Sequence, residues 1–136
     1  MMLDKEKIGQ HVKEAVGRFE YNVNGGALIR PAYKYVYYDP SSGVPAMFIG
    51  RDTPNAMNET GVAITLAGDR FWGDKVSLGS DVSARYFSRA HNWDVRSGTV
   101  SGMYHYWGPG SVFEFDFIAV NGNEQRHIIG HFILEV

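Results

Sequence analysis

The stretch 111–120, SVFEFDFIAV, decides the fold class because apolar and acidic side chains alternate along it. In an extended chain successive side chains point to opposite faces, so Phe113, Phe115 and Phe117 share one face. The two acidic side chains between them share the other face. This pattern predicts a half-buried antiparallel strand, apolar on the inside and wet on the outside.

The same period of two extends over most of the chain. Asn121-Gly122 is a strong turn signal and predicts a hairpin from 111–120 into 125–135, QRHIIGHFILE. Further strands are expected at 19–23, 27–38, 44–49, 61–66, 70–78, 82–88 and 99–107, with turn residues between them. Eight or nine short strands at regular spacing favour an all-β, antiparallel barrel or sandwich.

Length and composition limit the other possibilities. A chain of 136 residues fits a single domain with one core. Thirteen basic and fifteen acidic residues leave a net charge of -2, so there is no electrostatic reason to expect nucleic acid as the partner. The sequence has no cysteine, which excludes disulfides and thiolate chemistry. No apolar run approaches the length of a membrane helix.

The N-terminal stretch has a different period. Leu3, Ile8, Val12 and Val16 recur at spacings that predict a short amphipathic α-helix over residues 1–18, followed by the β-domain over 19–136. The polar face of this helix mixes lysines with acidic residues, so we expect it to dock on the β-domain or on a second chain rather than on a membrane. The stretch is also too charged for the apolar region of a signal peptide.

Two pairs of polar side chains could carry chemistry. His127 and His131 share a face of the strand 125–135, and Glu114 and Asp116 on the neighbouring strand could complete a metal site or act as paired carboxylates. The competing interpretation is an ordinary wet strand face, and we favour it. No nucleophile or phosphate-loop motif accompanies these residues. We therefore expect no catalytic residue, no metal ligand and no cofactor.

The aromatic side chains allow two interpretations. The run 104–107, YHYW, could line a ligand pocket at a barrel mouth or fill the interior of a small barrel, and we favour the interior. By alternation and clustering, the expected inward residues are Phe71, Trp72, Phe113, Phe115, Phe117, Ile129 and Phe132.

Three groups of motifs, in order along the chain, carry a resemblance to a known family. The first is YNVNG at 21–25 with AYKYVY at 32–37, and the second is GVAITL at 61–66 leading into Phe71-Trp72-Gly73. The third is Phe115-Asp116-Phe117 with Gly130-His131-Phe132. Together they resemble the virulence-associated protein (Vap) family of the VapA type, found in Rhodococcus, over most of residues 19–134.

This resemblance implies a compact, closed, eight-stranded antiparallel β-barrel with a filled interior and no enzymatic site. It also implies secretion and a role in binding a host membrane lipid or a host protein in the phagosome or endolysosome. The chain departs from the family in its N-terminal stretch, which leaves a cytoplasmic location open, and in a longer segment at 79–98. The residues that carry the family motifs are expected to be structural: Phe71, Trp72, Gly73, Phe115, Phe117, Gly130 and His131.

Two other functions stay open at this point. A small-molecule binder of the lipocalin or avidin sort would need a hollow barrel. An enzyme would use the two histidines and two carboxylates named above, and would need a cleft or a metal between them. Neither the binding residues nor the oligomeric state follow from the sequence.

Overall fold

The computed structural model describes residues 12–39, 41, 45–53, 59–66, 72–79, 81–89, 91–104 and 110–135, with only the backbone at Trp72 and Tyr104. Over these ranges the regular structure is entirely β-strand, and every strand pairing is antiparallel. The strands are β1 (Val12–Glu14), β2 (Val16–Val23), β3 (Tyr33–Tyr38), β4 (Pro45–Arg51), β5 (Gly61–Leu66), β6 (Trp72–Ser77), β7 (Val82–Ser88), β8 (His91–Tyr104), β9 (Ser111–Asn121) and β10 (Glu124–Glu135).

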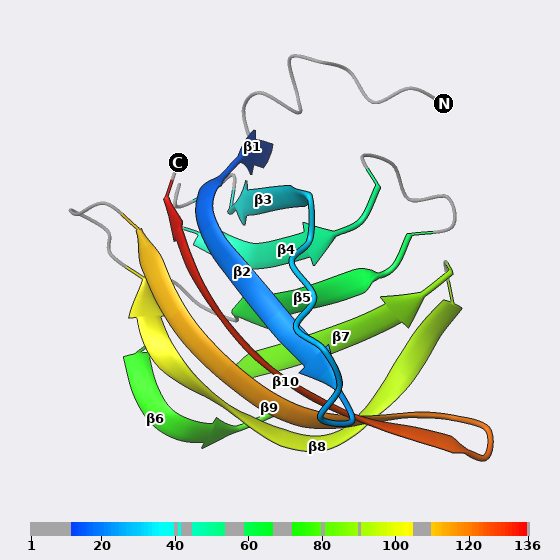
Figure 1. The fold of residues 1–136 in the computed structure, drawn as a ribbon. Helices are drawn as coiled ribbons and strands as arrows, with labels where there is room; N and C mark the ends of the chain where they lie inside the picture. The colour runs from blue at the N-terminus through cyan, green and yellow to red at the C-terminus, as the bar shows by residue number, and fades with distance from the viewer. Residues whose placement is uncertain are drawn as a thin grey trace.

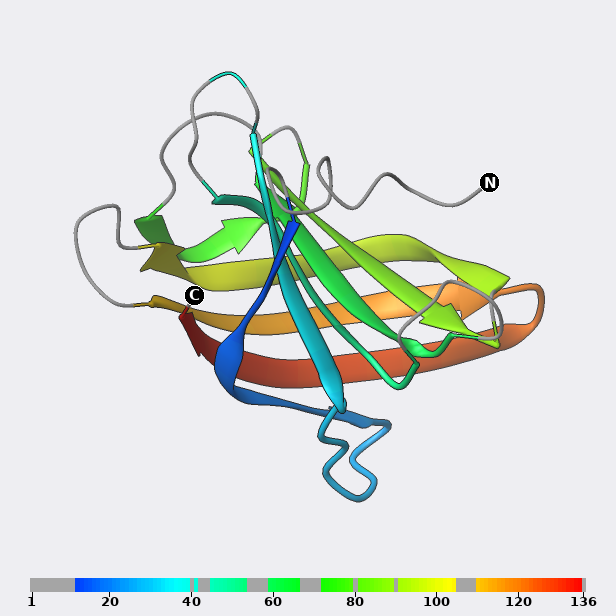
Figure 2. The same cartoon turned by 90° about the horizontal axis from the view of Figure 1, so that it is seen from above.

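The sheet curls until its two ends nearly meet. Its strand order is β1-β3-β4-β5-β7-β8-β9-β10-β2, so β1 and β2 lie at opposite ends of the order although Ala15 alone separates them in the chain. The Ala15 N–H donates a hydrogen bond of 2.9 Å to the Lys34 carbonyl of β3, which fixes the bend between the two strands. The outcome is a nearly closed antiparallel barrel (Figures 1 and 2).

The number of strand positions round this barrel agrees with the expected eight. Of the ten strands in the described ranges, β1 and β2 form one bent strand, and β6 lies off the main order, which leaves eight positions. The long strand β8 makes this possible because it pairs with β7 at residues 91–93 and with β6 at residues 99–103. Strands β6, β8, β9, β10 and β2 together form a strongly curved sheet (Figure 1).

Aromatic rings fill the barrel interior. Phe132 on β10 lies at the centre, with ring centroids 5.1 Å from Phe19, 5.0 Å from Phe48 and 5.1 Å from Phe113. Phe115 and Phe117 continue this packing along β9, and all six rings are buried. A binder of the lipocalin or avidin sort would need a cavity where these rings lie.

One end of the barrel holds an inward-facing cation. The Arg126 guanidinium lies 4.3 Å from the centroid of the Trp93 ring and donates a hydrogen bond of 2.7 Å to the Tyr86 hydroxyl. An Arg stacked on an aromatic face is stabilised by the ring quadrupole. This cluster ties β10 to β7 and β8 from the inside.

The predicted N-terminal helix is wrong over residues 12–18, which form β1 and the start of β2, and residues 1–11 lie outside the described ranges. Val12 and Val16 are four residues apart, a spacing that fits one helix face and also one strand face. These residues form strands because β1 pairs with β3 and β2 pairs with β10. The Val16 side chain is 63% exposed. No helix in the described part of the chain could span a membrane.

Most of the expected core residues in the described ranges are buried, with one correction. Phe113, Phe115, Phe117 and Phe132 are buried as predicted, whereas Ile129 faces outward and is 40% exposed. Its neighbour Ile128 is buried instead, so Ile128 and not Ile129 belongs to the inward face of β10. The expected core positions Phe71 and the Trp72 side chain lie outside the described part of the structure.

Two strands begin several residues away from their expected starts. The strand expected at 27–38 begins at Tyr33, and before it only Ile29 makes an isolated bridge, to Tyr21. Residues 91–98, for which no strand was expected, are the first half of β8.

Candidate functional site

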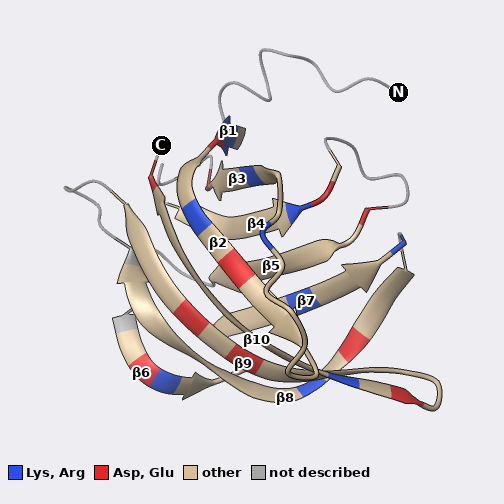
Figure 3. Cartoon of the chain, viewed as in Figure 1, with Lys and Arg blue, Asp and Glu red and all other residues tan. Residues whose placement is uncertain are grey.

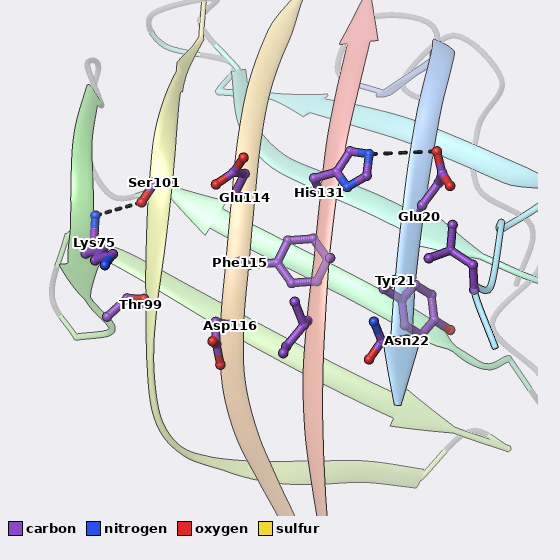
Figure 4. A pocket seen from close by; sticks show the side chains of 13 residues that line it. Glu20, Tyr21, Asn22, Lys75, Thr99, Ser101, Glu114, Phe115, Asp116 and His131 are labelled. Atoms are coloured by element: carbon purple, nitrogen blue, oxygen red, sulfur yellow. Dashed lines mark hydrogen bonds and ion pairs between the residues drawn. The ribbon is translucent and has the colours of Figure 1, made fainter. Parts of the chain in front are cut away.

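A groove with a volume of about 360 Å³ lies on the outer face of the curved sheet (Figure 4). Strands β2, β6, β8, β9 and β10 all contribute to it, and the segment after β2 forms its rim. Its polar lining residues are Glu20, Asn22, Lys75, Thr99, Ser101, Glu114, Asp116 and His131, and its apolar lining comes from Tyr21, Leu28, Phe115, Ile129 and Gly130.

Strand register arranges the outward side chains of this groove in two rows. In the first row, His131 on β10 pairs with Glu114 on β9 and with Glu20 on β2. Glu114 in turn pairs with Ser101 on β8. Directly paired side chains on one face are close enough to interact. The second row runs parallel to it through Thr99, Asp116, Ile129 and Asn22.

The Glu20 carboxylate is the most buried charge of the groove, with a side chain that is 8% exposed. Its Oε1 lies 3.2 Å from Arg18 Nε and its Oε2 lies 3.3 Å from Arg30 Nη2. His131 Nε2 lies 3.7 Å from Oε1 (Figure 4). A buried carboxylate needs such partners because desolvation disfavours an isolated charge.

The opposite wall of the groove is built by β6. The Lys75 backbone N–H donates a hydrogen bond of 2.7 Å to Ser101 Oγ, and the Ser101 hydroxyl donates one of 3.2 Å to Asp74 Oδ1. Lys75 has φ of 51°, in the left-handed region that a non-glycine residue seldom adopts. The pairing of β6 with β8 shifts register between Gly73 and Val76, so this bulge brings Lys75 to the groove.

The floor of the groove depends on Gly130. A Cβ atom at this position would lie 2.6 Å from the Phe115 ring, 2.6 Å from Tyr21 Cβ and 2.5 Å from the Glu20 carbonyl oxygen. Only glycine therefore lets β2, β9 and β10 approach so closely here. Tyr21 itself is buried beneath the groove, and burial raises the pKa of its phenol, with smaller contributions from Tyr86 and Asp52. Tyr21 is thus a neutral hydroxyl, not an anion, at neutral pH.

The two histidines and two carboxylates that could have formed a metal site do not come together as one cluster. All four residues share the outer face, as the alternation predicted, but His127 Nε2 contacts Asp116 Oδ1 at 2.5 Å while His131 faces Glu20. Among the described residues, no three His, Asp or Glu side chains form a group that could hold a metal ion.

The family-motif residues have different surroundings. Phe115 and Phe117 belong to the core, Gly130 lies in the groove floor, and His131 lies in the groove wall. Gly73 lies on β6, where an added Cβ would meet Val76.

Sequence reasoning missed Glu20, Arg18 and Arg30 as parts of one site. The alternation of charged and aromatic residues at 18–21, RFEY, was the available signal for an outward Arg18 and Glu20. The turn residues Asn24-Gly25-Gly26 were the available signal for the Tyr21–Ile29 bridge that brings Arg30 beside them.

Beside the groove lies an exposed apolar row, which we call the aliphatic row: Met103, Val112 and Ile133. Register places these three side chains next to one another across β8, β9 and β10, and Ile133 pairs onward with Arg18 on β2. Each is between 41% and 49% exposed. Contiguous exposed apolar side chains beside polar ones are typical of contact surfaces.

Comparison with known proteins adds no further information: no family model, curated protein or solved structure matches the chain. The resemblance to the Vap family therefore rests on the quoted motifs alone.

Proposed function

We propose that this protein is a non-enzymatic, Vap-like β-barrel that acts by binding, with the outer face of β6, β8, β9, β10 and β2 as its contact surface. One observation carries the proposal: aromatic rings occupy the interior, while the groove and the aliphatic row lie together on this outer face. In the described ranges, the groove and the aliphatic row thus offer binding chemistry on the outside of the barrel, whereas aromatic rings fill its centre.

The ionic contacts of two groove carboxylates, Glu20 and Asp116, favour binding over catalysis. A general acid or base needs a carboxylate or imidazole that is available to the substrate. Glu20 is neutralised by two guanidinium groups, and Asp116 is in contact with His127. These contacts hold the side chains in place as parts of a surface.

The partner we propose is a host membrane or a host protein, as the family resemblance implies. The aliphatic row offers apolar side chains that could enter a lipid interface or the apolar centre of a protein contact. A secreted protein would meet either partner, and the proposal includes secretion.

Flotation with lipid vesicles tests the membrane form of the proposal. The full chain is mixed with vesicles of neutral lipid and with vesicles that also contain anionic lipid, and the bound fraction is measured after centrifugation. We expect the double substitution V112T/I133T to reduce the floated fraction several-fold, because it removes apolar contact while it keeps β-branched side chains.

The matched control is V120T, the same substitution on the same strand at the hairpin end of β9, away from the aliphatic row. It should leave flotation unchanged. Flotation that is equal for both variants would refute the aliphatic row as the contact. A chain that floats with neither vesicle would refute the membrane as partner.

A further inference from the structure

We propose that Arg18 and Arg30 form an anion clamp, positioned by Glu20, that binds a phosphate group. The proposal goes beyond the proposed function and does not depend on it, because a phosphate group can bind to the clamp whether or not the chain contacts a membrane.

The clamp is built around one buried carboxylate. The side chain of Glu20 is 8% exposed, yet those of Arg18 and Arg30 are 67% and 72% exposed. The ion pairs use Nε of Arg18 and Nη2 of Arg30 on different carboxylate oxygens. Glu20 thus holds two guanidinium groups side by side while most of each remains accessible to a ligand.

Backbone hydrogen bonds fix the positions of both arginines. Arg18 lies on β2, where it pairs with Ile133 of β10. Arg30 follows Ile29, which exchanges two backbone hydrogen bonds with Tyr21: Tyr21 N–H to the Ile29 carbonyl at 3.0 Å, and Ile29 N–H to the Tyr21 carbonyl at 2.7 Å. This bridge brings the segment before β3 back against β2. The two side chains are therefore pre-positioned, which reduces the entropy lost on binding.

The charge of the cluster is positive. Two guanidinium groups face one carboxylate, which leaves one excess positive charge even with His131 neutral. Glu114 is the neighbouring carboxylate, but it is the cross-strand partner of His131 and lies on the far side of it from Glu20. In Figure 3 basic and acidic positions follow one another along β2, in agreement with this arrangement.

Two adjacent guanidinium groups can bind a phosphate group through several hydrogen bonds at once. Each guanidinium presents several N–H donors in a planar fork, which matches the oxygens of a phosphate in bidentate geometry. A lysine offers only a point charge. The phosphate group could belong to a free small molecule or to a phospholipid headgroup, and the same fork would recognise both.

Titration calorimetry with inorganic phosphate tests the clamp. The full chain is titrated at constant ionic strength, with chloride as the replaced anion. We expect R18Q/R30Q to weaken phosphate binding by at least about tenfold. The matched control R85Q/R89Q removes the same charge from β7 and the turn after it and should change affinity by less than about twofold.

Two further measurements make the test decisive. R18K/R30K keeps both charges but loses the forks, so it should also weaken binding; unchanged affinity would refute bidentate recognition. Circular dichroism confirms that each variant is folded. Equal losses in R18Q/R30Q and R85Q/R89Q would show general electrostatic attraction and overturn the clamp.

A second titration, with vesicles, distinguishes a free phosphate ligand from a phospholipid headgroup. Vesicles of neutral lipid with and without a phosphate-monoester lipid are compared with inorganic phosphate. Clamp-dependent binding to the soluble ion assigns a free phosphate ligand, and clamp-dependent binding only to the monoester vesicles assigns a headgroup. Binding to neither overturns the proposal.

Discussion

At the scale of single residues, Gly130 joins the core to the groove. An added methyl group would meet the Glu20 carbonyl and Tyr21 Cβ, and neither of these atoms can move without the β2 backbone. We therefore expect Gly130→Ala to lower the free energy of unfolding by about 1–3 kcal/mol, as overpacking does. Denaturant unfolding of the purified chain measures this.

Gly79→Ala is the matched control, because nothing lies within 4 Å of a Cβ at Gly79. Because an alanine fits there without strain, it should raise the free energy of unfolding by less than about 1 kcal/mol. The gain arises because alanine restricts the unfolded chain more than glycine does. If the two substitutions had equal effects, the close approach of β2 and β9 at Gly130 would be contradicted.

The face to which a side chain points could be predicted from sequence only where its strand alternates regularly. On β9 the strict alternation of Phe with acidic residues predicted both faces, and both are confirmed. On β10 the pair Ile128-Ile129 offers two apolar neighbours, and local pattern cannot tell which of them faces inward. Glu20 is a different case: it lies on an outer face and is still buried, with Arg18 and Arg30 as its ion-pair partners.

At the scale of elements, β1 is the strand that completes the barrel. Its three residues pair with Tyr35, Val36 and Tyr37 of β3, and Ala15 adds the bond to Lys34. Without β1, this edge of β3 would lose its pairing partner. β1 is also short, so its contribution can be removed without disturbing β9 and β10.

Two truncations measure this contribution. We expect deletion of residues 1–15 to lower the free energy of unfolding by about 2 kcal/mol relative to deletion of residues 1–11, since a few backbone hydrogen bonds and the buried Ala15 are lost. Hydrogen exchange should become faster at β3 amides and stay unchanged in β10. Unchanged protection of β3 would show that β1 does not close the barrel.

The elements that sequence analysis placed wrongly are those whose pattern fits two periods. Val12 and Val16 satisfy both a helix face and a strand face, and only long-range pairing with β3 and β10 selects the strand. β8 was recognised only in its second half, because a register shift between Val95 and Ser97 interrupts the alternation that Trp93 and Val95 begin. Tertiary pairing outweighs local propensity in both cases.

At the scale of the whole molecule, the barrel buries Tyr21 and partly buries Tyr38, and ionisation of either phenol opposes folding. Burial raises the pKa of Tyr21, with Tyr86 and Asp52 adding to the shift, and burial also raises the pKa of Tyr38. In the unfolded chain both phenols titrate near pH 10. Below that pH both states keep their protons, so this contribution to stability is fully present.

Above about pH 10 the unfolded chain releases protons that the folded chain retains, so the free energy of unfolding falls as the pH rises. Each tyrosine whose pKa is strongly raised adds a slope of about 1.4 kcal/mol per pH unit in this range. Denaturant unfolding between about pH 9 and 11 should show the loss, and Y21F should reduce its slope because the more strongly shifted group is gone. Y38F should reduce it less. A wild-type stability that stays constant up to pH 11 would mean that water reaches the Tyr21 hydroxyl, and that the barrel is less tightly packed beneath the groove than its contacts indicate.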